Sequence, residues 1–259
     1  IGMVHLGPLP GNYDYIDNEA YQETIKNAII DAKTLESAGI HGLIIENAAS
    51  SPYLINDDVE IIDVVCMTHI ASLITKEVKI PVGINVCSNA AKQSISICKA
   101  TGASFIRATG WANGYYNSNG YVSPSHPNAL KYKKYIDAKD VVVMADVKVK
   151  NGSHFILNDK TIKEMVADNF SAKADAVIIT GASTGVKPNI DELKELQGGT
   201  NGPIVMGSGT TTENLKDFMP YVDAFIVGTY FKENRKMSEP VLYNNVKEFM
   251  DEWHHLMEE

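Results

Sequence analysis

The chain has 259 residues, of which 44% are hydrophobic and 21% charged, as is typical of a globular domain with a full core. A formal net charge of −9 argues against a nucleic-acid-binding surface. No apolar run approaches membrane-spanning length and no secretory signal is visible, so we expect a cytoplasmic protein without a membrane span.

Short apolar runs alternate with amphipathic segments along the first half of the chain. Residues 1–6 predict a strand, and apolar positions at helical spacing predict a helix over 18–37. The same alternation continues with strands predicted at 42–45, 81–86 and 104–107, and helices at 57–76, 89–100 and 128–138. Residues 108–126 form the longest irregular stretch, and its aromatic side chains, Trp111 among them, favour an active-site lid over a disordered excursion.

The second half of the chain repeats the alternation without a linker. Strands are predicted at 141–146, 176–180 and 204–206 and before Gly228, with helices at 160–169, 190–196, after Thr212 and at 241–257. Eight such units favour a closed barrel, because an open doubly wound sheet should carry a glycine fingerprint at its first turn, which here reads GPLPG. The sequence therefore predicts an α/β fold, a single (βα)8 TIM-barrel domain over residues 1–259.

Two glycine turns follow the seventh and eighth predicted strands. They are Gly207-Ser208-Gly209, which leads through three threonines into a helix, and Gly228-Thr229. Glycine lets the backbone approach a ligand closely, and barrels of this kind hold phosphate after strands seven and eight. One such turn alone is equally a tight turn, but the pair in this order predicts a site for phosphate or another anion.

Polar side chains stand at nearly every predicted strand end, where barrels of this class carry their chemistry. The candidates are His5, Glu46 with Asn47, Asn85, Arg107, Asp146 with Lys148 and Lys150, Thr180 with Thr184, Ser208, and Thr229 with Lys232. A barrel with a purely structural role does not need this arrangement.

Glu46 and Asp146 are the acid/base candidates. Glu46 follows an apolar run, so its pKa could rise in a poorly hydrated mouth, but an ion pair with Arg107 or Lys150 is an equal alternative. The alternation over residues 146–150 predicts that its three charges share one direction. A lysine there could neutralise a phosphate or form a Schiff base, and phosphate binding is the simpler requirement. For His5, a catalytic role and a core role are equally supported.

Metal and cofactor binding are not predicted. His5, Glu46 and Asp146 could form a mixed oxygen and nitrogen site, but no closely spaced ligand motif accompanies them. The three cysteines, Cys66, Cys87 and Cys98, lack metal or redox spacing and are interpreted as buried thiols of a reducing compartment.

Motifs along nearly the whole chain resemble the BtpA family, which includes a photosystem I biogenesis protein of cyanobacteria and the SgcQ-type proteins of enteric bacteria. The motifs are IGMVHLGPLPG, GLIIEN, GASFIR, ADVKVK, DAVIITGASTG, GSGTTTENL and DAFIVGTYFK. The resemblance implies a TIM barrel of the ribulose-phosphate-binding kind. It also implies that the phosphate-binding half is retained, namely Thr180, Gly181, Gly207, Ser208, Gly209, Gly228 and Thr229.

The sequence departs from the family pattern at Thr109, where an asparagine is expected, and at four further positions near the acid/base half. They are Ser50, Ser88, Ala90 and Asn151, where the pattern leads us to expect an acid, an arginine, an aspartate and a histidine. These departures weaken any transfer of the family's chemistry.

Two hypotheses follow for the function. The first is an enzyme that acts on a phosphorylated sugar or a nucleotide-like molecule by isomerisation or by carbon–carbon or glycosidic cleavage. The alternative, motivated by the four departures, is a non-catalytic metabolite sensor or a factor for assembling another complex. The expected partner is a phosphorylated small molecule and not a nucleic acid, and the sequence allows a homo-oligomer.

Overall fold

Eight parallel strands form a sheet whose order follows the chain in the computed structural model, which describes residues 1–258. They are β1 (Gly2–His5), β2 (Leu43–Glu46), β3 (Val82–Asn85), β4 (Phe105–Ala108), β7 (Val142–Asp146), β8 (Ala176–Thr180), β9 (Ile204–Gly207) and β10 (Ala224–Ile226). A parallel bridge between Gly2 and Val227 joins the last strand to the first. The ring is thereby closed, and the predicted TIM barrel is confirmed.

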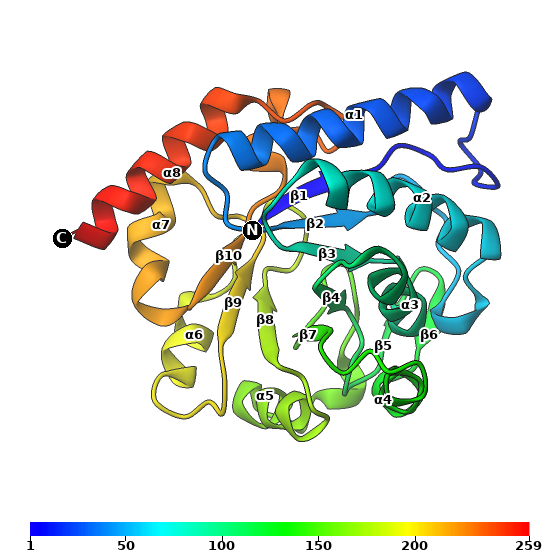
Figure 1. Cartoon of the computed structure of the whole chain (residues 1–259). Coiled ribbons are helices and arrows are strands. Elements are labelled where there is room, and N and C mark those ends of the chain that lie inside the picture. Colours follow the sequence, from blue (N-terminus) through cyan, green and yellow to red (C-terminus); the bar gives the residue numbers. More distant parts are fainter. Residues whose placement is uncertain (259) are drawn as a thin grey trace.

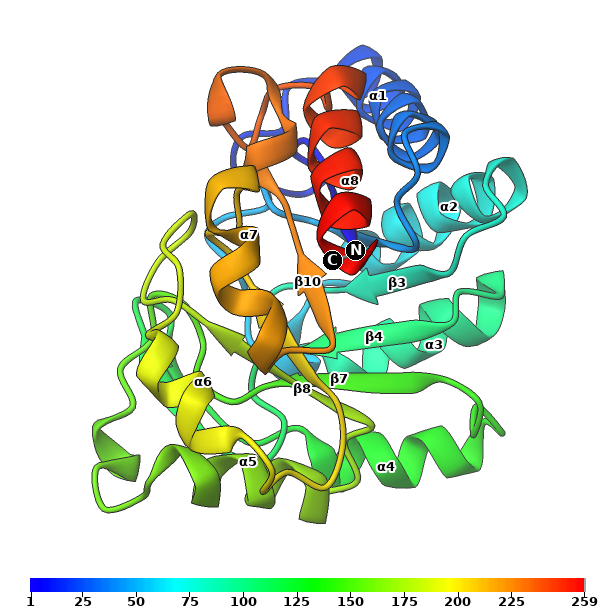
Figure 2. The same cartoon turned by 90° about the vertical axis from the view of Figure 1, so that its left-hand side faces the viewer.

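Helices surround the strands on the outside (Figure 1). They are α1 (Asn18–Ser37), α2 (Ile61–Glu77), α3 (Ala91–Thr101), α4 (His126–Tyr135), α5 (Ile162–Ser171), α6 (Ile190–Leu196), α7 (Thr212–Phe218) and α8 (Tyr243–Glu258). The start of α1 is set by Asp17, whose carboxylate accepts a hydrogen bond from the amide of Ala20 at 2.8 Å. Helix α8 packs against both α7 and α1, as Figure 2 shows, so the ring of helices also closes.

An apolar layer fills the inside of the barrel below its mouth. It consists mainly of Met3, Ile44, Phe105, Ile178, Val205 and Ile226. Gly83 leaves room for Phe105, because an added Cβ would lie 2.2 Å from its ring. His5, Glu46 and Arg107 each stand two positions beyond a member of this layer, so alternation along the strands directs them to the same inner side. The polar layer at the mouth therefore lies directly above a dry core.

Residues 108–126 are more ordered than the sequence predicts. They contain an antiparallel hairpin, β5 (Tyr115–Asn117) and β6 (Gly120–Val122). Backbone hydrogen bonds in both directions join Tyr116 to Ser153. Trp111 is fully buried, and its indole N–H donates to the carbonyl of Ala172 at 2.9 Å. The prediction that this ring faces the mouth as part of a lid is therefore wrong, because Trp111 fills the core instead.

Two expectations from composition have a counterpart in the structure. Among residues 1–258, no helix combines the length and the apolar character that crossing a bilayer requires. The thiols of Cys66 and Cys98 are free and buried as predicted, whereas Cys87 is only half-buried.

Candidate functional site

A cavity of about 430 Å³ lies at the carboxyl ends of the strands. Nine residues predicted for the site line it: His5, Glu46, Arg107, Lys150, Thr184, Ser208, Gly209, Gly228 and Thr229. The first four come from the β1 to β7 side of the barrel, and the others from the turns after β8, β9 and β10. Charged groups and glycine turns thus face one space.

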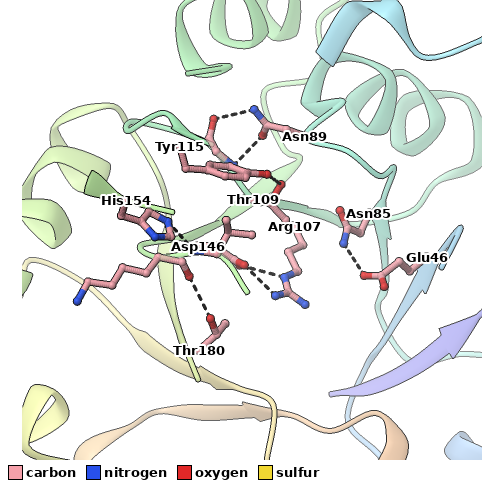
Figure 3. Close-up of polar contacts among 12 residues, drawn as sticks. Glu46, Asn85, Asn89, Arg107, Thr109, Tyr115, Asp146, His154 and Thr180 are labelled. Carbon is pink, nitrogen blue, oxygen red and sulfur yellow. Dashed lines mark hydrogen bonds and ion pairs between the residues drawn. The ribbon is translucent and has the colours of Figure 1, made fainter. Parts of the chain in front are cut away.

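Two polar pairs organise the charged side of the cavity (Figure 3). The parallel register places Glu46 beside both His5 and Asn85, and the Asn85 amide donates to Glu46 Oε2 at 2.5 Å. Arg107 donates from Nε and Nη2 to the two carboxylate oxygens of Asp146, at 3.0 and 2.8 Å. The two side chains of this second pair are 4% and 0% exposed. Such a bidentate pair fixes the arginine in the floor of the cavity.

Glu46 is an anion at neutral pH. Burial disfavours its carboxylate, but the attraction of His5, which is charged only at acidic pH, of Arg107 and of Lys150, together with the Asn85 hydrogen bond, outweighs burial and lowers the pKa of Glu46 below its ordinary value. Of the two alternatives that the sequence left open, the raised pKa is therefore wrong, and the lowered pKa agrees with the one in which Arg107 and Lys150 lie close to Glu46. Glu46 is poised to accept a proton rather than to donate one.

His5 is a neutral imidazole at the same pH. Burial lowers its pKa to about 4, against the opposing attraction of Glu46, and Lys232, Lys150 and Arg107 lower it further. Its Nδ1 is buried and has no hydrogen-bond partner within residues 1–258. A neutral ring with an unused nitrogen lies at the cavity wall.

Asp146 and Lys148 do not line this cavity. Both oxygens of Asp146 are engaged by Arg107, so the structure gives it a supporting position rather than the predicted acid/base position. Lys148 instead pairs with Glu192 at 2.7 Å. The expectation that the charges of residues 146–150 share one direction is wrong, because β7 ends at Asp146 and the strand alternation ends with it.

Lys150 is the residue of this segment that lines the cavity. Its pKa is lowered by burial and then by the Arg107 cation, while Glu46 and Asp146 oppose the change. A lysine of lowered pKa next to a carboxylate suits either of the two predicted roles, charge neutralisation or Schiff-base formation.

Five predicted binding residues do not line this cavity: Asn47, Asn85, Thr180, Gly181 and Gly207, of which Thr180 and Gly181 line a second pocket. Asn47 accepts a hydrogen bond from the amide of Cys87 at 2.7 Å. Thr180 donates its hydroxyl to the carbonyl of Lys148 at 3.0 Å. At Gly181 an added Cβ would lie 2.1 Å from the Val186 carbonyl oxygen, so the glycine allows residues 181–187 to fold back.

The glycine turns keep unused amide donors. The N–H groups of Gly209, Thr210 and Gly228 have no acceptor within residues 1–258. Ser208 Oγ, by contrast, already accepts a hydrogen bond from the Gly185 amide at 2.8 Å and joins two loops. Gly209 has a φ of 72°, and an added Cβ would lie 2.3 Å from the Lys187 nitrogen. This glycine is thus required by a neighbouring loop, and not only by the space for an anion as expected.

Sequence reasoning missed several lining residues, among them Thr210, Tyr230 and Arg235. Thr210 is 2% exposed, and its hydroxyl is buried without a partner within residues 1–258. It resembled a helix cap in sequence, but Thr211 is the residue that caps α7. Arg235 lies outside the regular strands, in the 3-10 turn η5 (Glu233–Arg235), where no pattern marks it.

The four departures from the family pattern lie away from the cavity lining. Ser50, Ser88 and Ala90 are buried, and Asn151 occupies a turn with a φ of 57°. They therefore do not change the groups that face the cavity. Within residues 1–258, no three His, Cys, Asp or Glu side chains gather as metal ligands would.

The free energy of unfolding is expected to fall as the pH drops from about 6.5 to about 4, by about 3 kcal/mol for His5 alone. In this pH range His5 binds a proton in the unfolded protein but stays neutral in the native protein. His154, whose pKa is also lowered by burial, acts in the same direction. Urea unfolding of the parent, His5→Gln and His154→Gln at several pH values checks this. An equally steep pH dependence in the parent and His5→Gln would contradict it.

Comparison with known proteins identifies a family and relatives that this chain resembles. Residues 1–255 match the model of the BtpA family. An uncharacterised protein of Methanocaldococcus jannaschii is 35% identical over 251 residues, which cover 97% of this chain and 93% of that protein. The photosystem I biogenesis protein BtpA of Synechocystis sp. is 29% identical over 97% of this chain and 86% of its own length.

Solved structures show the same fold. Thiamine phosphate pyrophosphorylase from Pyrococcus furiosus is similar with a TM-score of 0.59, over 99% of this chain and 96% of that chain, at 10% identity. At that identity the likeness concerns the fold alone. The family match over nearly the whole chain, together with the archaeal relative, shows that this protein belongs to the BtpA family.

Proposed function

We propose that this protein is an enzyme that binds a small phosphorylated molecule in the mouth cavity and moves a proton on it through Glu46. The observation that carries the proposal is that Gly209, Thr210 and Gly228, whose amides have no acceptor within residues 1–258, line the same cavity as an ionised carboxylate, and that Thr210 adds a buried hydroxyl without a partner. Phosphorylated sugars and nucleotide-like molecules are the substrate class.

The glycine-turn side of the cavity has the groups that a phosphate needs. A buried hydroxyl without a partner costs free energy until a ligand pairs with it, so Thr210 favours an occupied state. The amides of Gly209 and Gly228 add donors from two neighbouring turns. The structural neighbour with this fold is a thiamine phosphate pyrophosphorylase, a protein whose name includes a phosphorylated compound, and this supports the proposed anion site.

The opposite side of the cavity has the groups for proton transfer. The Glu46 carboxylate can take a proton from a C–H next to a carbonyl, and the electron pair of that bond moves onto the carbonyl oxygen. Lys150 and the neutral His5 line the same space and can stabilise the resulting negative oxygen. Where the deprotonated carbon also carries a hydroxyl group, the hydroxyl proton moves to the former carbonyl oxygen, Glu46 returns its proton to the former carbonyl carbon, and the hydroxyl oxygen becomes the new carbonyl. This completes an aldose–ketose isomerisation without any co-reactant.

Replacing Thr210 with valine tests the phosphate site. We expect affinity for ribose 5-phosphate and inorganic phosphate to fall by about 10- to 100-fold, the effect of losing one hydrogen bond to a charged group. The melting temperature of the ligand-free protein should not fall, because the change removes an unpaired buried hydroxyl. Calorimetric titration and thermal unfolding measure the two effects.

Thr68→Val on α2 is the control, since its hydroxyl contacts only its own helix, and it should leave affinity unchanged. A parent protein that binds no phosphorylated compound at millimolar concentration rules out the proposal. Binding without turnover across a panel of sugar and nucleoside phosphates contradicts its enzymatic part.

A further inference from the structure

We propose that Arg235 binds the phosphate group directly and makes the site selective for terminal phosphate monoesters over phosphodiesters. Near pH 8 a monoester carries two negative charges, because its second pKa is about 6, whereas a diester carries one. This inference rests on the proposed function and adds the form of phosphate that the site prefers.

The guanidinium group of Arg235 lies over an aromatic ring at the cavity. Its guanidinium carbon lies 4.0 Å from the centroid of the Tyr230 ring, and both residues line the cavity. The Tyr230 hydroxyl lies 2.6 Å from Thr212 Oγ1, which fixes the ring in turn. Stacking uses the face of a guanidinium and leaves the N–H donors at its edge free for an oxyanion.

No carboxylate neutralises Arg235. The charge of Arg235 is one of the influences that lower the pKa of Glu213. Within residues 1–258, however, no acidic group forms an ion pair with Arg235. Among the other cations near the mouth, Arg107 pairs with Asp146 at 2.8 Å and Lys232 with Asp31 at 3.0 Å, and Lys150 lines the cavity on the Glu46 side. Arg235 is therefore a cation available to a ligand beside the glycine turns.

The backbone around Arg235 is in an uncommon conformation. Asn234 and Arg235 have φ values of 50° and 57°, in the left-handed region that non-glycine residues seldom adopt. The turn is anchored from below, because the Arg235 amide donates to the carbonyl of Lys232, whose ammonium group is buried against Asp31. A strained residue held by a buried ion pair keeps its side chain over Tyr230.

Charge balance in the cavity calls for such a cation. Neutral amides and the Thr210 hydroxyl can hold one negative charge, but the ionised Glu46 carboxylate faces the same space and repels a second. A guanidinium that pairs with phosphate oxygens offsets that repulsion and contributes most to a doubly charged group. The preference for a monoester follows from this balance.

Titration of two probes tests the proposal: methyl phosphate, a monoester, and dimethyl phosphate, a diester, at about pH 8. We expect the parent to bind methyl phosphate about 10-fold more tightly. Arg235→Gln should weaken methyl phosphate about 10-fold and dimethyl phosphate less than about 2-fold. Arg235→Lys, which keeps the charge without the planar fork, should lie between the parent and Arg235→Gln.

Lys236→Gln is the matched control, because it removes the same charge from the next residue, which does not line the cavity. Lys236→Gln should not change the affinity for methyl phosphate or for dimethyl phosphate. The melting temperatures of all variants should be close to that of the parent. Equal losses for both probes in Arg235→Gln, or no loss, overturn the role of Arg235 while the phosphate site stands. If the parent binds neither probe, the proposed function itself fails.

Discussion

Asp146→Ala is expected to lower the free energy of unfolding by about 3–5 kcal/mol. The variant leaves the Arg107 guanidinium buried without its partner, and a buried uncompensated charge is among the costliest defects in a protein. The pKa of Arg107 is raised because the Asp146 carboxylate outweighs the effect of burial, so the arginine cannot escape the cost by losing its proton. Urea denaturation at neutral pH measures the loss.

Two further variants separate this effect from a general loss of charge. Asp191→Ala breaks an exposed pair with Lys194 and should cost less than about 1 kcal/mol. Replacing both buried partners, Arg107→Met with Asp146→Leu, should restore most of the stability, because no charge remains buried. A cost below about 1 kcal/mol for Asp146→Ala would show that the pair does not support the mouth.

Glu46→Gln should reduce turnover of the phosphorylated substrate by about 100- to 10,000-fold. Glutamine matches glutamate in size, and its carbonyl oxygen can still accept the hydrogen bond from Asn85, but it cannot take up a proton. Phosphate affinity should not fall, because the change removes a negative charge from the cavity. Steady-state kinetics on the best compound of the binding panel, with titration calorimetry alongside, measure both quantities.

Glu192→Gln serves as the comparison, since Glu192 is a carboxylate at the same end of the barrel that lies outside the cavity. Its turnover should match the parent. Undiminished turnover in Glu46→Gln would remove Glu46 from the chemistry, whatever the phosphate affinity.

The fold was accessible from sequence because each barrel unit carries its own local signals. The predicted helix 18–37 and strand 176–180 have the same limits as α1 and β8. In the helix, apolar residues at helical spacing mark the buried face, and in the strand a continuous apolar run marks a segment that is buried on both faces. Polar residues at strand ends were also informative. His5, Glu46 and Arg107 stand two positions beyond inner-layer residues, and a parallel register brings such positions together.

The rest depends on neighbours that are distant in sequence. The pKa of Glu46 is set by His5, Arg107 and Lys150, which come from three other segments. Arg235 carries no local signal, because its place above Tyr230 results from an irregular turn. Trp111 resembled a lid residue because it lies in a polar stretch, and only the packed structure shows the carbonyl to which it donates.

The contact of Gly83 with Phe105 has a consequence for how this barrel can change over evolution. The Phe105 ring on β4 occupies the volume that a side chain at position 83 on β3 would need. A Cβ added to Gly83 would lie 2.2 Å from that ring. Enlarging Gly83 alone overpacks the interior, and shrinking Phe105 alone leaves a void, so each single step is penalised. The two positions are therefore expected to change together, because a protein that loses the ring needs a larger side chain across the strand pair to fill the void.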